Sequence, residues 1–337
     1  MRPASRPAAS LPELAWLLDT VRVVAIPTRT RFRGVTVREA AIFSGPEGAT
    51  EFSPFPEYAD AEAAAWLAAA IEYGWQPAPE PLRDTVEVNA TVPAVGPDRV
   101  PEILARFPGC RTVKVKVAER GESLDDDLAR VRAVRAHAGS DARIRVDANG
   151  GWSLDEARVA LDRLAPLDLD YAEQPCATVP ELAQLRAELA GAVRIAADES
   201  VRRAEDPLAV ARAGAADLLI VKAQPLGGIR QALAILAAAG LPAVVSSALD
   251  TSVGISMGAR LAACLPEPAA AGLGTVALLA GDIVTEPRLP VRGRIPSARA
   301  TLDPAALERF AAAPERVAWW RARISRCHAL LAAQPAG

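Results

Sequence analysis

The sequence contains few of the residues on which several large enzyme classes depend. Its 337 residues include only two histidines, His137 and His328, both in arginine-rich stretches that we expect to be helical and exposed. A histidine-based catalytic triad or a histidine-rich zinc site therefore lacks its components. The four cysteines form no CxxC pair, which indicates free thiols in a reducing cytosol.

Long apolar runs and a large excess of one charge are also missing. The apolar stretch at residues 11–18 contains Glu13 and is followed by Asp19, so it does not resemble the core of a signal peptide. No run approaches the ~18 apolar residues that span a bilayer. The net charge of −3 gives no electrostatic reason to expect a nucleic-acid partner. We therefore expect a cytoplasmic protein that binds neither membrane nor nucleic acid.

The first 85 residues and the tail differ in pattern from the middle of the chain. Strands are predicted at 21–27, 35–43 and 49–52, the last two joined as a hairpin, followed by an alanine-rich helix at 61–73. The basic segment 28–34 is predicted as a loop. The tail from residue 285 is largely helical, and its Trp319 and Trp320 need an apolar surface to pack on. We expect the tail to return to the N-terminal α+β unit.

From residue 86 onward, predicted strands and helices alternate about eight times over roughly 190 residues. The strands are predicted at 86–92, 111–117, 143–147, 167–173, 193–197, 217–222, 242–246 and 272–275. This alternation predicts a parallel sheet, and eight units favour a closed barrel. A doubly wound open sheet is the alternative, but no GxGxxG follows the first strand, which counts against a dinucleotide site.

Polar side chains recur where these strands end. Asp147 and Asn149 lie two residues apart and so share one face of a strand, just before a glycine pair and a capping box of Ser153 and Glu156. The next two strands end in carboxylates as well. The other polar residues at strand ends are Lys114 and Lys116, Glu173, Asp198 and Glu199, Lys222, and Ser246 and Ser247.

Each of these features has an ordinary structural explanation when taken singly. A Lys-Val-Lys strand is typical of a sheet edge, and an acidic pair is typical of a helix cap. Taken together, three consecutive carboxylates at one rim would repel one another unless a cation held them. Oxygen ligands suit a hard ion such as Mg²⁺. Asp198 and Glu199 face opposite ways on an extended strand, so their spacing alone does not decide which is a ligand.

The lysines predict a base beside this cation. Buried lysines are costly unless they are used, because burial disfavours the charged form. Lys114 and a divalent cation would both lower the pKa of Lys116 from its reference of ~10.4 towards the ~7–8 that suits proton abstraction at neutral pH.

These elements resemble the enolase superfamily, in which a lysine or histidine base works beside Mg²⁺. The resemblance rests on Lys114-Val115-Lys116, Asp147-Ala148-Asn149, Glu173-Gln174-Pro175, Asp198-Glu199-Ser200 and Lys222. It implies an α/β fold with a modified (β/α)₇β TIM-type barrel at 86–284 and an α+β capping domain built from 1–85 plus 285–337. The lysine pair and the later single lysine resemble the muconate-lactonizing subgroup.

Within that subgroup, segments 31–34, 51–58, 88–93 and 246–254 resemble the lyases that dehydrate a succinyl-hydroxycyclohexadiene carboxylate in menaquinone biosynthesis. The resemblance implies Mg²⁺, with Mn²⁺ as the alternative, on Asp147, Glu173 and Asp198. Lys116 would be the base, Lys222 would stabilise the enediolate, and Lys114 would tune Lys116 and contact the carboxylate. The remaining implied contacts are support from Asn149 and Glu199, substrate binding by Ser246 and Ser247, and closure of the cap by Arg31 and Arg33, for which a solvated basic loop is the alternative.

Other functions fit the same residues. An N-succinylamino acid racemase or a dipeptide epimerase would use the same metal and lysines. A non-catalytic barrel that binds a metal or a carboxylate is the alternative of another class, although it has no use for two inward lysines. Metal-assisted hydrolysis would need histidine ligands or a second metal cluster. The expected partner is a small-molecule carboxylate; the sequence leaves the oligomeric state open, a monomer included.

Overall fold

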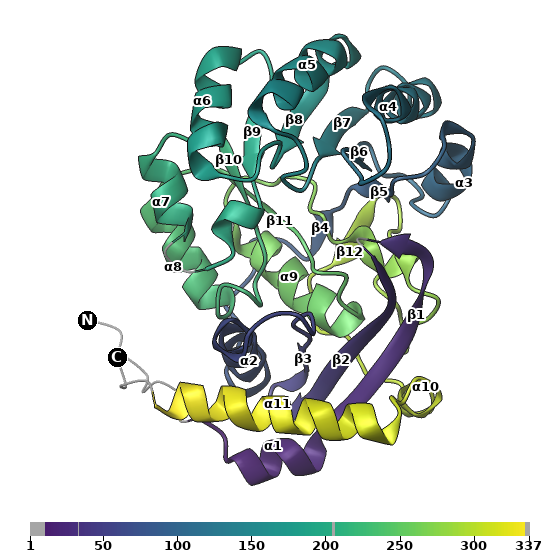
Figure 1. The fold of residues 1–337 in the computed structure, drawn as a ribbon. Helices are drawn as coiled ribbons and strands as arrows, with labels where there is room; N and C mark the ends of the chain where they lie inside the picture. The colour runs from purple at the N-terminus through teal and green to yellow at the C-terminus, as the bar shows by residue number, and fades with distance from the viewer. Residues whose placement is uncertain (1–10, 33, 204–205, 334–337) are drawn as a thin grey trace.

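Seven parallel strands curl into the body of the molecule in the computed structural model, which describes residues 11–32, 34–203 and 206–333. Their order in the sheet follows the order of the chain (Figure 1). The strands are β5 (Ala90–Val92), β6 (Thr112–Lys116), β7 (Arg143–Asp147), β8 (Leu169–Glu173), β9 (Ile195–Ala197), β10 (Leu218–Val221) and β11 (Ala243–Val245).

A short eighth segment joins the two edges of this sheet. Parallel bridges connect Ala271 to Val88 and Gly272 to Ser246. The predicted strand at 272–275 is therefore shorter than expected, because the chain turns into the 3-10 helix η4 (Gly274–Leu278). The sheet closes as a (β/α)₇β-type barrel, which confirms the predicted fold class.

Helices follow the strands and cover the outside of the barrel (Figure 1). Their apolar faces pack on the strands in one continuous core. The predicted capping boxes at Ser153 and Thr178 are both present and start α5 and α6. The helices are α3 (Val100–Leu104), α4 (Leu124–Ala138), α5 (Leu154–Leu164), α6 (Val179–Leu189), α7 (Asp206–Arg212), α8 (Ile229–Ala239) and α9 (Ser252–Cys264).

The prediction of one continuous strand at 86–92 is wrong. The chain forms β4 (Thr85–Glu87), which pairs with β12 (Arg294–Pro296) in a separate two-stranded sheet, and only then enters the barrel as β5. The break falls at Val88 and Asn89, whose N–H groups donate to the carbonyls of Gly293 and Ala271, both at 2.9 Å. The backbone changes its partner there, which an apolar run in the sequence does not reveal.

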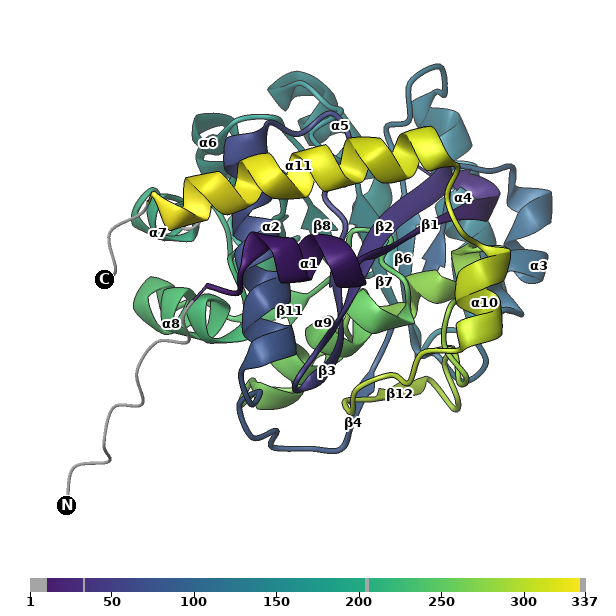
Figure 2. The same cartoon turned by 90° about the horizontal axis from the view of Figure 1, so that it is seen from below.

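A small α+β unit, called the cap below, covers one side of the barrel (Figures 1 and 2). It has an antiparallel sheet of β1, β2 and β3 with helices packed on it. Its elements are α1 (Leu14–Thr20), β1 (Arg22–Phe32), β2 (Val35–Gly45), β3 (Gly48–Phe52), α2 (Asp60–Trp75), α10 (Pro304–Arg309) and α11 (Pro314–Ala332).

The tail returns to the N-terminal unit, as predicted. Trp320 of α11 is fully buried and meets the ring of Phe52 edge-on, with 5.6 Å between ring centroids. His137 is exposed as expected, but His328 is half-buried, with its Nε2 2.8 Å from the carbonyl oxygen of Pro12. The domain boundaries at 85 and 285 stay a prediction. No helix in the described ranges is long and apolar enough to cross a membrane.

The basic segment predicted as a loop is mostly strand. β1 continues through Arg31 to Phe32, which pairs with Val35 of β2, so Arg31 lies in a strand. Alternating threonine and arginine favour a strand, since threonine is β-branched. Charge alone was a poor signal for a loop. Arg33 lies outside the described residues.

Candidate active site

Three carboxylates gather at the carboxyl ends of adjacent barrel strands. Asp147 ends β7 and pairs in register with Glu173, which ends β8. Asp198 directly follows β9. All three side chains are buried, with exposed fractions of 0%, 1% and 4% in chain order. Parallel strands all run in one direction, so the three side chains meet at one end of the barrel, where barrel enzymes carry their active sites.

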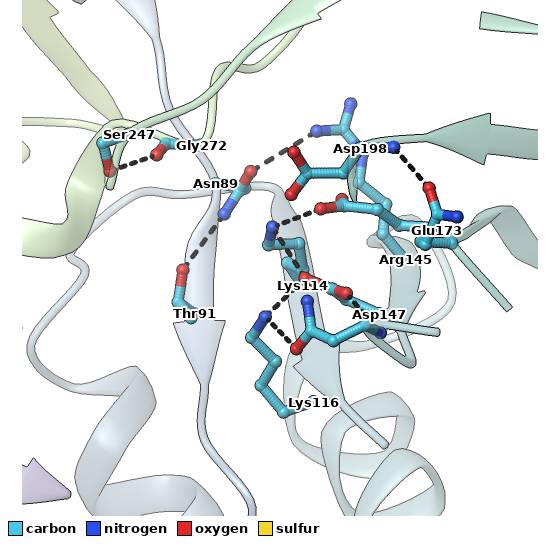
Figure 3. A network of polar contacts seen from close by, with 12 residues as sticks. Asn89, Thr91, Lys114, Lys116, Arg145, Asp147, Glu173, Asp198, Ser247 and Gly272 are labelled. Carbon is cyan, nitrogen blue, oxygen red and sulfur yellow. Dashed lines mark hydrogen bonds and ion pairs between the residues drawn. The ribbon is translucent and has the colours of Figure 1, made fainter. Parts of the chain in front are cut away.

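Three lysines contact these carboxylates, and Figure 3 shows two of them, Lys114 and Lys116 of β6, beside Asp147 and Glu173. Lys114 Nζ lies 2.9 Å from Glu173 Oε1 and 3.1 Å from Asp147 Oδ2. Lys116 Nζ lies 2.5 Å from Asp147 Oδ2. Lys222, which follows β10 on another side of the barrel, forms an ion pair with Asp198. The structure thus brings together all the lysines and carboxylates that the sequence analysis singled out for the chemistry.

Lysine is otherwise absent from the sequence. The chain has 38 basic residues other than histidine, of which only Lys114, Lys116 and Lys222 are lysines. A chain that uses arginine for every other basic position keeps lysine where its chemistry differs, because an ammonium can lose its proton in a protein and a guanidinium cannot. The small number of lysines was therefore available in the sequence as a sign of the active site, but no prediction was based on it.

The electrostatics of this cluster are unbalanced at Glu173. Burial, and then the charge of Asp147, raises the pKa of Glu173 to about 8. Burial lowers the pKa of Lys114, but the negative charges of Glu173 and Asp147 raise it by more. The net result is a raised pKa of Lys114. Glu173 Oε2 is buried and has no hydrogen-bond partner. The site therefore has an unused oxygen donor and an excess of carboxylate around Glu173.

These residues fit a hard divalent cation. The donors are carboxylate oxygens, which suit Mg²⁺, and Glu173 Oε2 is an orphaned one. Within the described ranges, no three histidine, cysteine or acidic side chains are already grouped closely enough to hold a metal ion. The reason is local, since lysine ammonium groups lie against the carboxylates. A cation would take over the place of those ammonium groups.

Asn149 contacts Lys116, and Glu199 is linked to that lysine through Asn149. Lys116 Nζ donates to Asn149 Oδ1 at 2.8 Å, and Asn149 Nδ2 donates to Glu199 Oε1 at 3.3 Å. Asn149 has a φ of +49°, a left-handed conformation that asparagine tolerates better than most residues. This backbone turn aims its side-chain oxygen at Lys116.

Gln174, for which no role was predicted, is fully buried next to Glu173. Its Oε1 accepts from the N–H groups of Asp198 at 3.0 Å and Ser200 at 3.2 Å. Its Nε2 donates to Ser200 Oγ at 2.8 Å. Gln174 therefore holds the backbone that carries Asp198. An uncharged amide directly after a strand-end carboxylate was the available signal.

The far wall of the site is polar but uncharged. Ser247 Oγ donates to the carbonyl of Gly272 at 3.1 Å and lies 2.7 Å from Thr275 Oγ1. Ser246 is buried beside it. Thr91 and Thr275 were not predicted. A cavity at the barrel mouth is lined by Thr91, Lys114, Lys116, Asp147, Asp198, Lys222, Ser246, Ser247, Gly272 and Thr275.

The cap is fastened to the loop that carries the two serines. Glu51 of β3 is fully buried and accepts from Thr251 Oγ1 at 2.6 Å and from Gly254 N–H at 2.9 Å, both at the start of α9. Burial, and then the charge of Asp250, raises the pKa of Glu51 to about 7. Arg38 of β2 donates to the carbonyl of Leu249 at 3.2 Å. Glu51 and Arg38 were not predicted to connect the cap and the barrel, because the predicted site residues were taken from the ends of the barrel strands.

Comparisons with known proteins agree with this architecture. The profile of the family described as "Enolase C-terminal domain-like" matches residues 101–300, and that of "Enolase N-terminal domain-like" matches residues 23–74. Among solved structures, the muconate lactonizing enzyme from Pseudomonas fluorescens complexed with muconolactone has a TM-score of 0.73 at 22% identity, covering 87% of this chain and 98% of that one. This likeness supports the fold.

Curated relatives are much closer in sequence. The o-succinylbenzoate synthase of Mycolicibacterium smegmatis is 56% identical over 95% of this chain and 99% of its own. That of Mycobacterium tuberculosis is 54% identical over 95% of this chain and 97% of its own. At this identity over nearly the whole of each protein, the chain belongs to the o-succinylbenzoate synthase family of the enolase superfamily.

Proposed function

We propose that the cavity at the barrel mouth performs the o-succinylbenzoate synthase reaction with Lys116 as the base and a divalent cation on Asp147, Glu173 and Asp198. The substrate would be 2-succinyl-6-hydroxy-2,4-cyclohexadiene-1-carboxylate and the products 2-succinylbenzoate and water. One observation carries the proposal: all three lysines of the chain contact three buried carboxylates at the carboxyl ends of adjacent barrel strands.

The cation would be Mg²⁺, with Mn²⁺ as the alternative. Asp147, Glu173 and Asp198 would hold it, and the orphaned Oε2 of Glu173 supports this assignment. When bound, it would supply Lewis-acid chemistry that makes the carbon next to the substrate carboxylate more acidic. Lys114 already contacts two of these carboxylates and is placed to contact the substrate carboxylate as well.

Lys116 would remove the proton from the carbon that bears the ring carboxylate. Its Nζ lines the cavity, and Asn149 Oδ1, 2.8 Å away, fixes the direction of that nitrogen. As the C–H bond breaks, negative charge moves onto the carboxylate oxygens to give an enediolate. The ammonium of Lys222, on another side of the same cavity, opposes this charge.

The second step would expel the ring hydroxyl. The electron pair of the enediolate forms the new ring double bond while the C–O bond breaks, and Lys116 returns its proton to the departing oxygen to give water. The ring becomes aromatic, which favours the products. Lys116 thus ends the cycle deprotonated, as it began.

The remaining residues would position these groups and bind the succinyl end. Asn149 and Glu199 support Lys116 through their hydrogen bonds. Ser246 and Ser247 line the uncharged wall of the cavity and would donate hydrogen bonds to the succinyl end. Arg31 and Arg33 stay predictions for closing the cap, and the latter lies outside the described residues.

The direct test is an assay of the purified protein with the cyclohexadiene substrate and Mg²⁺, beside a panel of N-acylamino acids. The proposal predicts rapid formation of the aromatic product, which is measured by its ultraviolet absorbance. Absence of product with the metal-loaded protein would contradict it. By the same resemblance, we propose a place in menaquinone biosynthesis and in the cytoplasm.

N-succinylamino acid racemase is the second candidate, since Lys116 and Lys222 line one cavity from different strands. A racemase needs one lysine as acid and the other as base, one on each face of the substrate. The variant Lys222→Arg separates the two functions, because it retains the positive charge but cannot act as an acid or base near neutral pH. Retained dehydration favours the synthase; solvent-deuterium exchange of an N-succinylamino acid that disappears in this variant favours a racemase.

A further inference from the structure

A second cavity opens at the opposite end of the barrel. It is lined by residues in the first three positions of barrel strands, among them Arg145, Tyr171, Leu218 and Val244. Its volume of about 720 Å³ falls within the range of ~300–1,000 Å³ that is usual for small-molecule sites. Among the described residues, none lines both this cavity and the one at the barrel mouth. We call it the lower cavity.

Two buried side chains present unused donors to the lower cavity. Tyr171 is 2% exposed, and its hydroxyl has no hydrogen-bond partner among the described residues. Arg145 is also 2% exposed and lies over the Tyr171 ring, 4.7 Å from its centroid. Arg145 Nε and Nη1 are engaged with Asp170 and Ala270, but Nη2 donates to no described residue.

The charge around these donors is positive. Asp170 uses both side-chain oxygens, one 2.9 Å from Arg145 Nε and the other 2.5 Å from Arg194 Nη2. Arg143 also lines the cavity, and its side chain has no partner among the described residues. Glu267 is exposed at the rim. The cavity therefore has three guanidinium groups and two carboxylates, and both oxygens of the Asp170 carboxylate are already paired with arginines.

The opposite wall is apolar. It is formed by a valine of β11 and by leucines of β10, of α8, of the segment before β11 and of the C-cap of α9. These side chains are Leu218, Leu233, Leu236, Leu241, Val244 and Leu265. A ligand that matches both walls has an anionic head for the arginines and an apolar body for the leucines. A purely structural role would explain the contacts of Asp170 but not the free tyrosine hydroxyl.

We propose that the lower cavity binds a small carboxylate with an apolar ring body. A guanidinium offers two parallel donors that match a carboxylate, and the tyrosine hydroxyl adds a third. Tyr171, Leu218 and Val244 belong to a buried cluster on neighbouring barrel strands, and no described residue lines both this cavity and the one at the barrel mouth. Binding here is therefore separate from substrate binding and does not depend on the proposed reaction.

The test is calorimetric titration of the full chain with benzoate. Benzoate should bind, and its affinity should fall about fivefold in Tyr171→Phe, which removes one hydrogen bond without changing the volume. Arg143→Ala should weaken binding at least as much. Lys222→Ala, in the barrel mouth, and Arg212→Ala, an exposed arginine that lines neither cavity, should leave this binding unchanged.

Chemical analogues sharpen the result. Benzylamine and benzamide should bind at least tenfold more weakly than benzoate, because they lack the anionic head. The proposal is overturned if benzoate does not bind, if Lys222→Ala abolishes binding while Tyr171→Phe does not affect it, or if benzylamine binds as tightly. Tyr171→Phe and Arg143→Ala remove a single donor each, and their melting temperatures check that both variants are folded.

Discussion

Two buried charged clusters near the barrel mouth are held in different ways. In the cavity, Asp147, Glu173 and Asp198 are contacted by lysine ammonium groups at the ends of flexible side chains. At the junction of cap and barrel, Glu51 is held by two hydroxyls and a backbone N–H, and Arg38 by backbone carbonyls. Ammonium groups can move when a ligand arrives, whereas backbone groups cannot. The first cluster is suited to exchange partners, and the second to hold the cap in place.

Removal of divalent metal should have the largest effect on activity, and it acts on the first cluster, formed by Asp147, Glu173 and Asp198. Dialysis against chelator should reduce dehydration to the uncatalysed level, because no cation then opposes the charge on the substrate carboxylate. Added Mg²⁺ should restore the rate, while added Ca²⁺, which prefers a larger and looser ligand set, should restore less. The absorbance of the product measures both the loss of activity in chelator and its recovery with each cation. Full activity in chelator would refute the assignment of the three carboxylates.

Loss of the proposed base comes next. Lys116→Ala should lower the turnover rate by at least ~10³-fold, in the range reported for general bases. Lys116→Arg should be similarly inactive, although it keeps the positive charge, because a guanidinium does not accept a proton. Metal affinity, measured by calorimetry, should persist in both. Substantial activity in Lys116→Arg would mean that this position supplies charge and not base chemistry.

The second cluster, which contains Glu51, should affect how the free energy of unfolding depends on pH. The pKa of Glu51 is raised to about 7 in the folded protein from the ordinary 4.5, so folding favours its protonated form. That contribution is full below pH ~4.5 and is lost as the pH rises through ~7. The loss amounts to about 3 kcal/mol, from ~1.36 kcal/mol for each pKa unit. The wild-type free energy of unfolding should therefore fall across this window.

Glu51→Gln should flatten that fall. The amide oxygen can still accept from Thr251 and Gly254, and the amide nitrogen can donate to Ser53, so the shape of the site is kept while the titrating group is lost. Urea unfolding at several pH values measures the slope. Equal slopes in the wild type and the variant would show that Glu51 does not titrate as described.

The smallest effect is expected on the uncharged wall. Ser247→Ala should raise KM about fivefold with little change in kcat, since the hydroxyl is proposed to bind the succinyl end and takes no part in proton transfer. Ser140→Ala, at an exposed serine in the turn after α4, is the matched control and should change neither. A fall in kcat without a change in KM would assign Ser247 to the chemistry.

The sequence predicted the barrel and the charged cluster because both depend on local patterns. Strand-end carboxylates repeat at Asp147, Glu173 and Asp198, and the capping boxes mark the helix starts. Contacts between distant segments left no such pattern. Glu51 meets Gly254 across 203 positions of the chain, and the strand break at Val88 depends on Gly293. Gln174 belonged to a motif of the resemblance but had no predicted role, since its contacts with Asp198 and Ser200 form only when two strand ends lie side by side.

The central claim is that a divalent cation takes the place of the lysine ammonium groups on the carboxylates. Because the chain has only three lysines, ¹³C-lysine labelling gives one Cε signal for each, assigned with the variants Lys114→Arg, Lys116→Arg and Lys222→Arg. Titration with Mg²⁺ should displace all three signals in one saturable transition, and Asp198→Asn should weaken that transition. Lysine signals that stay in place while Mg²⁺ activates the enzyme would contradict the account.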